Sequence, residues 1–183
     1  MAPGWQPLLD RIAAESNPRT KANLEIVARH VVEEVAGNTA ALMATLGPEP
    51  QYSVWGASDS TGPSGYDAVV EWYKRLQAAG RNRLDYIIHR VVADERSVVT
   101  EGDFQYAIPG RELSCTTAES GEAVLPDAYY LVTHRTTVIW PISADGLIEG
   151  EDIYSGERHR VRRQLAPDEM THLGPAERHR GLD

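Results

Sequence analysis

Two strand-like stretches of this chain carry carboxylates and aromatic side chains among β-forming residues. The first is residues 98–106 and the second is residues 148–154. Polar side chains at alternate strand positions cannot all face a dry core, so one sheet face is expected to line a pocket or to meet a partner. The side chains that could do chemistry in such a pocket are His89, Tyr52, Tyr106, Arg135 and Glu151.

The position of His89 follows from the turn that precedes the first stretch. A two-residue turn at Glu95 and Arg96 predicts that His89 lies opposite Gly102 and Ile87 opposite Phe104. An imidazole titrates near neutral pH, so His89 among apolar walls suits a general acid or base. The alternative is a core histidine with one satisfied hydrogen bond. This register turns five residues toward the pocket: Ile87, His89, Gly102, Phe104 and Tyr106.

The last hairpin fits two turn geometries around Gly146. A three-residue loop turns Arg135, Thr137 and Glu151 inward, whereas a two-residue loop puts His134 and Thr136 on the face of Glu151. The first is favoured, because glycine in the third loop position suits a bulge. Arg135 beside a carboxylate would then clamp an oxyanion or a carbonyl. The alternative for Glu151 is a place on a solvated strand rim.

Tyr52 and Tyr106 are the remaining polar candidates. A phenol can donate a hydrogen bond to a substrate carbonyl while its ring packs against apolar neighbours, although most aromatic residues in strands are simply core. The tryptophans favour an aromatic or polycyclic ligand over a sugar phosphate. Neither a glycine-rich phosphate loop nor a nucleophile elbow occurs in the sequence.

The elements that must position these residues change character along the chain. Asn17 is a suitable N-cap and Gly37 a suitable C-terminal stop for a helix with an apolar stripe. Helices are also expected over residues 38–46 and from Ser64 to residue 80, with a short strand between them. A period of two then predicts strands over residues 84–93, 98–108, 128–141 and 147–154. This order predicts an α+β fold with a curved antiparallel sheet wrapped around N-terminal helices.

Composition limits the class of protein and of partner. The chain has 183 residues, 42% of them hydrophobic and 25% charged, which is ordinary for one soluble globular domain. A net charge of -9 disfavours nucleic acid, and the apolar runs are too short to span a membrane. One cysteine and no signal-peptide pattern favour the cytoplasm. The six histidines lack the spacing of zinc sites, so neither a metal nor another cofactor is expected.

Three segments lie outside the central pattern of residues 17–156. Residues 1–16 are an N-terminal extension with a possible short helix. Residues 109–127 are too long for a simple hairpin and are expected to be a lid, an arm that grips a second subunit, or a surface loop. Residues 157–183 form a charged tail, poor in apolar residues, for which partial disorder is expected.

Four short patches, together with the element order, resemble the nuclear transport factor two-like superfamily, which includes SnoaL-like polyketide cyclases, ketosteroid isomerases, scytalone dehydratases and limonene epoxide hydrolases. The patches are residues 38–42, 65–69, 98–101 and 145–148. The resemblance spans roughly residues 17–155. It implies a cone with an internal pocket between helices and concave sheet, and commonly a homodimer through the outer sheet face.

The chain departs from the epoxide hydrolase pattern at the residues that would do that chemistry. The pattern would place Arg and Asp at Gly102 and Phe104, Asn at Val54 and Asp at Ile153, and only Tyr52 matches it. Epoxide hydrolysis by that route is therefore not expected. The comparison nevertheless implies that Val54, Gly102, Phe104, Tyr106 and Ile153 face the pocket.

The resemblance and the candidate residues together favour an enzyme that performs cofactor-free acid–base chemistry on a hydrophobic, carbonyl-bearing, polyketide- or steroid-like molecule. It would act as a cyclase, an isomerase or a dehydratase. His89 would move the proton, Tyr52 or Tyr106 would hold the oxygen, and Arg135 with Glu151 would orient the substrate or a water. The alternative is a non-catalytic carrier of a lipophilic molecule, or a dimeric scaffold.

Overall fold

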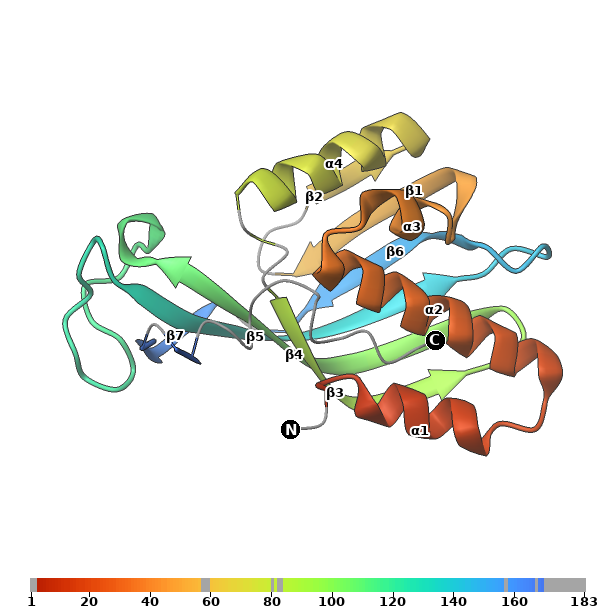
Figure 1. The fold of residues 1–183 in the computed structure, drawn as a ribbon, viewed down its shortest axis with the longest axis horizontal. Coiled ribbons are helices and arrows are strands. Elements are labelled where there is room, and N and C mark those ends of the chain that lie inside the picture. Colours follow the sequence, from red (N-terminus) through yellow and green to blue (C-terminus); the bar gives the residue numbers. More distant parts are fainter. Residues whose placement is uncertain are drawn as a thin grey trace.

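The computed structural model describes residues 3–56, 60–79, 81, 84–156, 158–166 and 168–169. Four helices cover one face of a curved sheet, which is open at its edges (Figure 1). This confirms the predicted α+β class and the order of helices before sheet. The helices are α1 (Gln6–Ala14), α2 (Pro18–Ala36), α3 (Thr39–Met43) and α4 (Tyr66–Ala78).

Helix α2 begins and ends where the sequence predicts. The side chain of Asn17 accepts hydrogen bonds from the backbone N–H groups of Arg19 and Thr20, at 2.9 and 3.1 Å. Gly37 ends the helix in the left-handed conformation, with φ of 68°, which glycine adopts without steric cost. Helix α3 is shorter than predicted, because β1 already starts at Leu46.

The sheet has seven strands in the order β2-β1-β6-β5-β4-β3, with β7 paired to β5. All pairs are antiparallel except β1 with β6. Strands β4 and β5 are the longest, and they extend beyond the helices into an arm (Figure 1, left). The strands are β1 (Leu46–Gly56), β2 (Ser60–Ser64), β3 (Leu84–Ala93), β4 (Ser97–Pro109), β5 (Tyr129–Pro141), β6 (Ile148–Ser155) and β7 (Arg160–Gln164).

An extra residue at His89 changes the register of β3 against β4. From the turn to Arg90 the pairing is as predicted, with Arg90 opposite Glu101. The register then shifts between Ile88 and Arg90, so Ile88 rather than His89 lies opposite Gly102. A bulge of this kind adds one residue to one strand of an antiparallel pair.

The predicted inward positions of His89 and Ile87 are therefore wrong. Side chains alternate between faces, so a slip of one residue moves Ile87 to the outer face and Tyr86 to the inner face. His89 is exposed, and its Nε2 lies 2.8 Å from a carboxylate oxygen of Asp103 on the outer face. Ile87 is paired with the same Asp103.

A second irregularity changes the register of β5 against β6. Ile142 bridges Ile148 near the loop, whereas Ile139 lies opposite Asp152. Three residue steps on β5 thus match four on β6, and Gly150, with φ of 142°, lies in the longer segment. Glycine adopts this positive φ more readily than residues with a Cβ.

This shift selects the alternative face for β5 and corrects the prediction for Arg135 and Thr137. His134 and Thr136 are buried on the inner face that also holds Glu151. Arg135 and Thr137 lie on the outer face, where the Arg135 guanidinium is 3.4 Å from Glu101. Because the slip occurs in β6, Glu151 still faces inward.

The arm includes the long loop and part of the predicted tail. The loop contains the short 3-10 helix η1 (Gly110–Glu112) and an isolated bridge between Thr117 and Ala123. Residues 160–164, assigned to the charged tail from the sequence, form β7 and pair with β5. Residues 170–183 of the tail lie outside the described residues.

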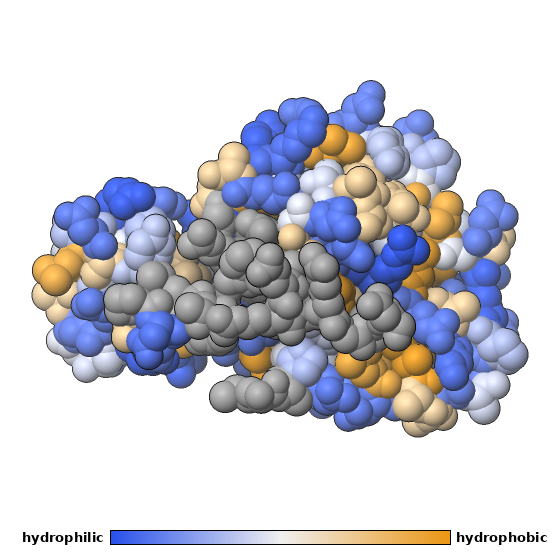
Figure 2. Space-filling model, in the orientation of Figure 1, coloured by the Kyte–Doolittle hydropathy of each residue, from blue (hydrophilic) through white to orange (hydrophobic). Residues whose placement is uncertain are grey.

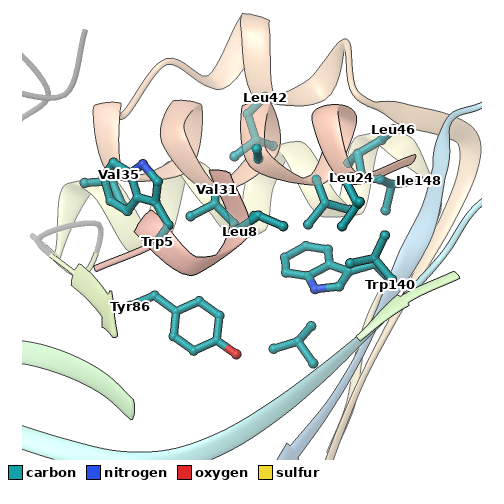
Figure 3. Packing of buried hydrophobic residues seen from close by; sticks show 14 of the residues in the cluster. Trp5, Leu8, Leu24, Val31, Val35, Leu42, Leu46, Tyr86, Trp140 and Ile148 are labelled. Carbon is teal, nitrogen blue, oxygen red and sulfur yellow. The ribbon is translucent and has the colours of Figure 1, made fainter. Parts of the chain in front are cut away.

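The main core lies between the helices and the inner sheet face. Figure 3 shows Val31 and Val35 of α2 and Leu8 of α1 on one side, with Tyr86 and Trp140 of the sheet on the other. Helix α1 belongs to this core through Leu8, which is fully buried, as is Trp5 just before the helix. The N-terminal extension is thus packed against the domain.

The surface in Figure 2 is mostly hydrophilic, with apolar residues in small patches. Exposed large apolar side chains include Trp55 and Tyr154, whose rings stack with centroids 6.4 Å apart. None of the helices in the described part of the chain combines the length and the apolar character needed to cross a membrane.

Candidate active site

A cavity of about 480 Å³ lies between the helices and the inner face of the sheet and continues to the arm. Its walls are mainly aromatic and aliphatic, which is typical of sites for small organic ligands. The end under the helices, called here the carboxyl end, contains Glu34 of α2 and Glu151 of β6. The end toward the arm, called here the arm end, includes Arg81, Tyr106 and His159.

A chain of hydrogen bonds leads to Glu151 at the carboxyl end. The Tyr73 hydroxyl of α4 donates to Glu151 Oε1 at 3.1 Å, and the Tyr52 hydroxyl lies 2.9 Å from that of Tyr73. Because the Tyr73 hydrogen is directed to Glu151, Tyr52 is the donor of the second bond. Burial, followed by the charge of Glu151, raises the pKa of both phenols well above the ordinary range, so both remain protonated.

His30 of α2 adds an imidazole with a defined tautomer. The Thr45 hydroxyl donates to the Leu42 carbonyl at 2.6 Å, so it accepts from His30 Nδ1–H at 2.7 Å. Nε2 is therefore the ring nitrogen that can accept or release a proton, and it lies 3.3 Å from Glu151 Oε1 and 3.1 Å from the Tyr73 hydroxyl. His30 is fully buried, so this geometry is fixed by packing.

Glu34 is the second carboxyl, one helical turn after His30. The carboxyl oxygens of Glu34 and Glu151 and the imidazole nitrogen of His30 all lie within 4.8 Å of one another. Burial, together with the negative charge of Glu151, raises the pKa of Glu34 to about 8. At neutral pH Glu34 therefore keeps its proton beside the negative charge of Glu151.

The sequence matches neither a protein-family model nor a curated protein. Solved structures do match. A SnoaL-like protein of the polyketide cyclase type from Jannaschia sp. CCS1 superposes with a TM-score of 0.58, at 16% identity, over 78% of this chain and 90% of its own. An LEH-like epoxide hydrolase from M. tuberculosis superposes with a TM-score of 0.54, at 19% identity, over 75% of this chain and 85% of its own. The chain has the nuclear transport factor two-like fold.

A third structure with this fold is SalBIII, an epoxide hydrolase/cyclase-like enzyme in pyran ring formation in the polyether salinomycin. It superposes with a TM-score of 0.54, at 13% identity, over 76% of this chain and 95% of its own. The carboxyl end described above thus lies inside a nuclear transport factor two-like cone, between its helices and its concave sheet face.

Five of the residues predicted to form the site line the cavity of this cone: Tyr52, Phe104, Tyr106, Glu151 and Ile153. Tyr52 and Glu151 meet at the carboxyl end through Tyr73, whereas Tyr106 belongs to the arm end. The Tyr52 hydroxyl donates its hydrogen to Tyr73, so Tyr52 orients that phenol rather than holding a substrate oxygen.

The other predicted residues do not line the cavity. Gly102 faces inward, but the Tyr86 ring packs against it, 2.8 Å from where a Cβ would stand. Val54 is half-buried on the face of Tyr52, outside the cavity lining. The remaining four are on the outer face, as the two register shifts require: His89, Arg135, Ile87 and Thr137.

Three residues of the carboxyl end were not predicted from the sequence: His30, Glu34 and Tyr73. A signal for the first two was present, since His30 and Glu34 are four residues apart and fall on the same stripe of α2 as Val27 and Val31. Polar groups on an otherwise apolar helix face must be satisfied or functional. Tyr73 gave no such signal, because an aromatic residue on the buried face of α4 looks like core.

In the described part of the chain, one group of side chains could hold a metal ion. It consists of His30, Glu34 and Glu151, each with one ligand atom. A tetrahedral ion with bonds of about 2.1 Å holds its ligand atoms about 3.4 Å apart. The three atoms lie within 4.8 Å of one another, and His30 Nε2 is 3.3 Å from Glu151 Oε1, which already accepts from Tyr73. Among the described residues no hydrogen bond joins Glu34 to Glu151, so the two carboxyls influence each other through charge.

Proposed function

We propose that this protein is an enzyme that moves protons without a cofactor on a hydrophobic, carbonyl-bearing substrate of the polyketide or steroid type. The observation that carries the proposal is the pair Glu34 and Glu151 at the wall of a largely apolar cavity, where their carboxyl oxygens lie within 4.8 Å of each other and burial with the Glu151 charge raises the pKa of Glu34 to about 8. Two carboxyls whose environments separate their pKa values supply an acid and a base at the same pH.

The geometry divides the roles as follows. The Glu151 carboxylate removes a proton from the carbon next to the carbonyl, and neutral Glu34 donates a hydrogen bond to the carbonyl oxygen as negative charge develops there. Tyr73 holds Glu151 in place, and Tyr52 holds Tyr73. His30 Nε2, 3.3 Å away, can take the proton from Glu151 and return it.

The fate of the enolate decides the reaction class. Return of the proton from Glu151 to another carbon gives an isomerase. Its transfer to a neighbouring hydroxyl, which then leaves as water, gives a dehydratase, and its transfer to the oxygen of a second carbonyl that the enolate carbon attacks closes a ring. The neighbours with this fold include a protein of the polyketide cyclase type and SalBIII, which has a role in pyran ring formation. Their names support a cyclase or a related lyase.

Exchange of substrate protons with solvent tests the proposal without knowledge of the final product. Aromatic β-diketones and other ketones with acidic α-protons would be incubated in D2O, and deuterium uptake followed by mass spectrometry. We expect catalysed exchange that falls by roughly 100- to 10,000-fold in Glu151→Gln. His89→Ala is the matched control and should leave the rate unchanged.

The competing function is a carrier of a lipophilic molecule. It is favoured by the location of His89 and Arg135 on the outer face, which removes two predicted catalytic groups from the cavity. A carrier would bind ketones and return them with every α-proton intact at background rates. That outcome would overturn the catalytic proposal.

The protein is also proposed to form a homodimer through the outer sheet face. The stacked and exposed Trp55 and Tyr154 lie on this face, beside the ion pairs of Arg135. Exposed aromatic residues among charged ones are typical of protein interfaces. Light scattering would test this, with Trp55→Ser expected to shift the mass toward that of one chain.

A further inference from the structure

The two ends of the cavity differ in the groups that they offer to a ligand. At the carboxyl end, no lysine or arginine among the described residues forms an ion pair with Glu34 or Glu151. A negatively charged ligand group is therefore repelled from this end. At the arm end the wall carries hydrogen-bond donors from Arg81, Tyr106 and His159, together with the Glu112 carboxylate, which is paired with Arg81.

Most of these donors are not used within the described part of the protein. The Tyr106 hydroxyl and the His159 imidazole have no hydrogen-bond partner among the described residues. Arg81 contacts Glu112 through one terminal nitrogen at 2.6 Å, and a guanidinium has five N–H donors. The arm end therefore presents free donors from three side chains.

The three groups also lie close enough to influence one another. Burial lowers the pKa of His159, and the positive charge of Arg81 lowers it further. The ring centroids of Tyr106 and His159 are 6.1 Å apart. Both effects favour the neutral form of His159, which has one N–H to donate, while Arg81 carries a positive charge that Glu112 partly offsets.

An aromatic wall runs toward the carboxyl end from these donors. The rings of Tyr86 and Phe104 lie 4.4 Å apart, and those of Phe104 and Tyr106 lie 6.1 Å apart. Behind them, buried His134 stacks on Tyr106 with an angle of only 6° between the ring planes. The ring planes of Tyr86 and Phe104 are tilted by 44° and those of Phe104 and Tyr106 by 54°, so the wall offers both ring faces and ring edges to an aromatic ligand.

We propose that the substrate is a planar aromatic carbonyl compound with a carboxylate, which the arm end binds through Arg81, Tyr106 and His159. The charge of Glu151 at one end and the hydrogen-bond donors of Arg81, Tyr106 and His159 at the other then orient the substrate, with its reacting carbonyl at the carboxyl end. The identity of the reacting end rests on the proposed function, whereas recognition of the carboxylate does not.

Binding of inert probes separates this proposal from catalysis. 2-Naphthoate and 2-naphthamide have the same shape but only the first is an anion, and neither has an α-proton to exchange. Calorimetric titration of the protein at pH 7 should show that 2-naphthoate binds about tenfold more tightly than 2-naphthamide, or more. Arg81→Met should bring the ratio of the two affinities close to one. Arg81→Lys should restore part of the preference, because lysine keeps the positive charge but lacks the paired N–H groups of a guanidinium.

Two controls show where the probe binds. Arg111→Met removes the same charge from η1 outside the cavity lining and should leave the ratio unchanged. Cys115 is the only cysteine of the chain and lines the arm end, so bound 2-naphthoate should slow its reaction with a maleimide. Glu34→Gln should retain the preference for the acid even if it abolishes proton exchange.

The proposal is overturned if wild-type protein binds the amide as tightly as the acid, or if Arg81→Met and Arg111→Met have equal effects. Binding of 2-naphthoate without protection of Cys115 would also contradict it, since the probe would then lie elsewhere. A failure of the exchange experiment with these binding results intact would refute the catalytic proposal alone.

Discussion

Replacement of Glu34 by glutamine should make the protein more stable at neutral pH. The pKa of Glu34 rises from 4.5 to about 8 in the folded protein because of burial and of the Glu151 charge. Between these values the unfolded chain loses the proton while the folded chain keeps it. The free energy of unfolding therefore falls as pH rises through this window, and the penalty is absent below the lower value.

The size of the effect follows from the pH interval. Between the unfolded pKa of 4.5 and pH 7, each pH unit lowers the free energy of unfolding by 1.36 kcal/mol, so the total penalty is about 3.4 kcal/mol. Part of the Glu34 side chain is exposed, so solvent screening reduces this, and we expect about 2 kcal/mol. Glu34→Gln removes the ionisable group and keeps its shape, and so recovers that energy while losing the acid.

Urea unfolding at pH 5, 7 and 8 would measure the difference between variant and wild type. We expect about 0.5 kcal/mol in favour of the variant at pH 5, about 2 kcal/mol at pH 7, and more at pH 8. Glu33→Gln on the same helix is the control, with a change within about 0.5 kcal/mol at each pH. A variant that is equally destabilised at every pH would refute the reasoning about the carboxyl pair.

Four further outcomes are expected. Exchange activity should decline above about pH 8, as Glu34 loses the proton that it donates, and the decline should be absent in Glu34→Gln, whose residual rate is low throughout. Thr45→Val removes the acceptor of His30 Nδ1–H and should slow exchange about tenfold, with near-normal binding of 2-naphthamide; an unchanged rate would exclude His30 from the relay. Dialysis against a chelator should leave the exchange rate intact, whereas a loss that zinc restores would show a metal at His30, Glu34 and Glu151. Gly102→Ala should destabilise the fold by about 1–3 kcal/mol, because its Cβ would collide with the Ile87 carbonyl and the Tyr86 ring.

The elements of this fold could be predicted because each has a local signal. Asn17 and Gly37 mark the ends of α2, and alternation of apolar and polar residues marks β3 to β6. The element order was then sufficient for the cone. Residues 160–164 were not recognised as a strand, because their arginines resemble a solvated tail until β5 supplies a pairing edge.

The orientation of the strand residues could not be predicted in full, because it depends on single insertions. The bulge at His89 and the extra residue near Gly150 each move a whole strand segment to the opposite face. Glu151 was placed correctly only because the second irregularity lies before it. Arg135, on the regular partner strand, was assigned to the wrong face.

The site itself was half visible in the sequence. Tyr52 and Glu151 could be predicted because they are polar residues in strand-like segments. His30 and Glu34 could not, because they lie within the apolar stripe of α2. That stripe contains enough valine and leucine to look like an ordinary core face. Only tertiary packing shows that its polar positions meet β6 across a cavity.

Carbon-13 NMR of protein labelled at the glutamate side-chain carboxyls tests the central claim most directly, with Glu34→Gln and Glu151→Gln used for assignment. We expect one carboxyl that keeps its proton until about pH 8. Its signal should be absent from Glu34→Gln. In Glu151→Gln, where the neighbouring charge is gone, it should titrate at a lower pH. If every glutamate of the folded protein has lost its proton by pH 6, the pair holds no proton at neutral pH, and the acid–base account is contradicted.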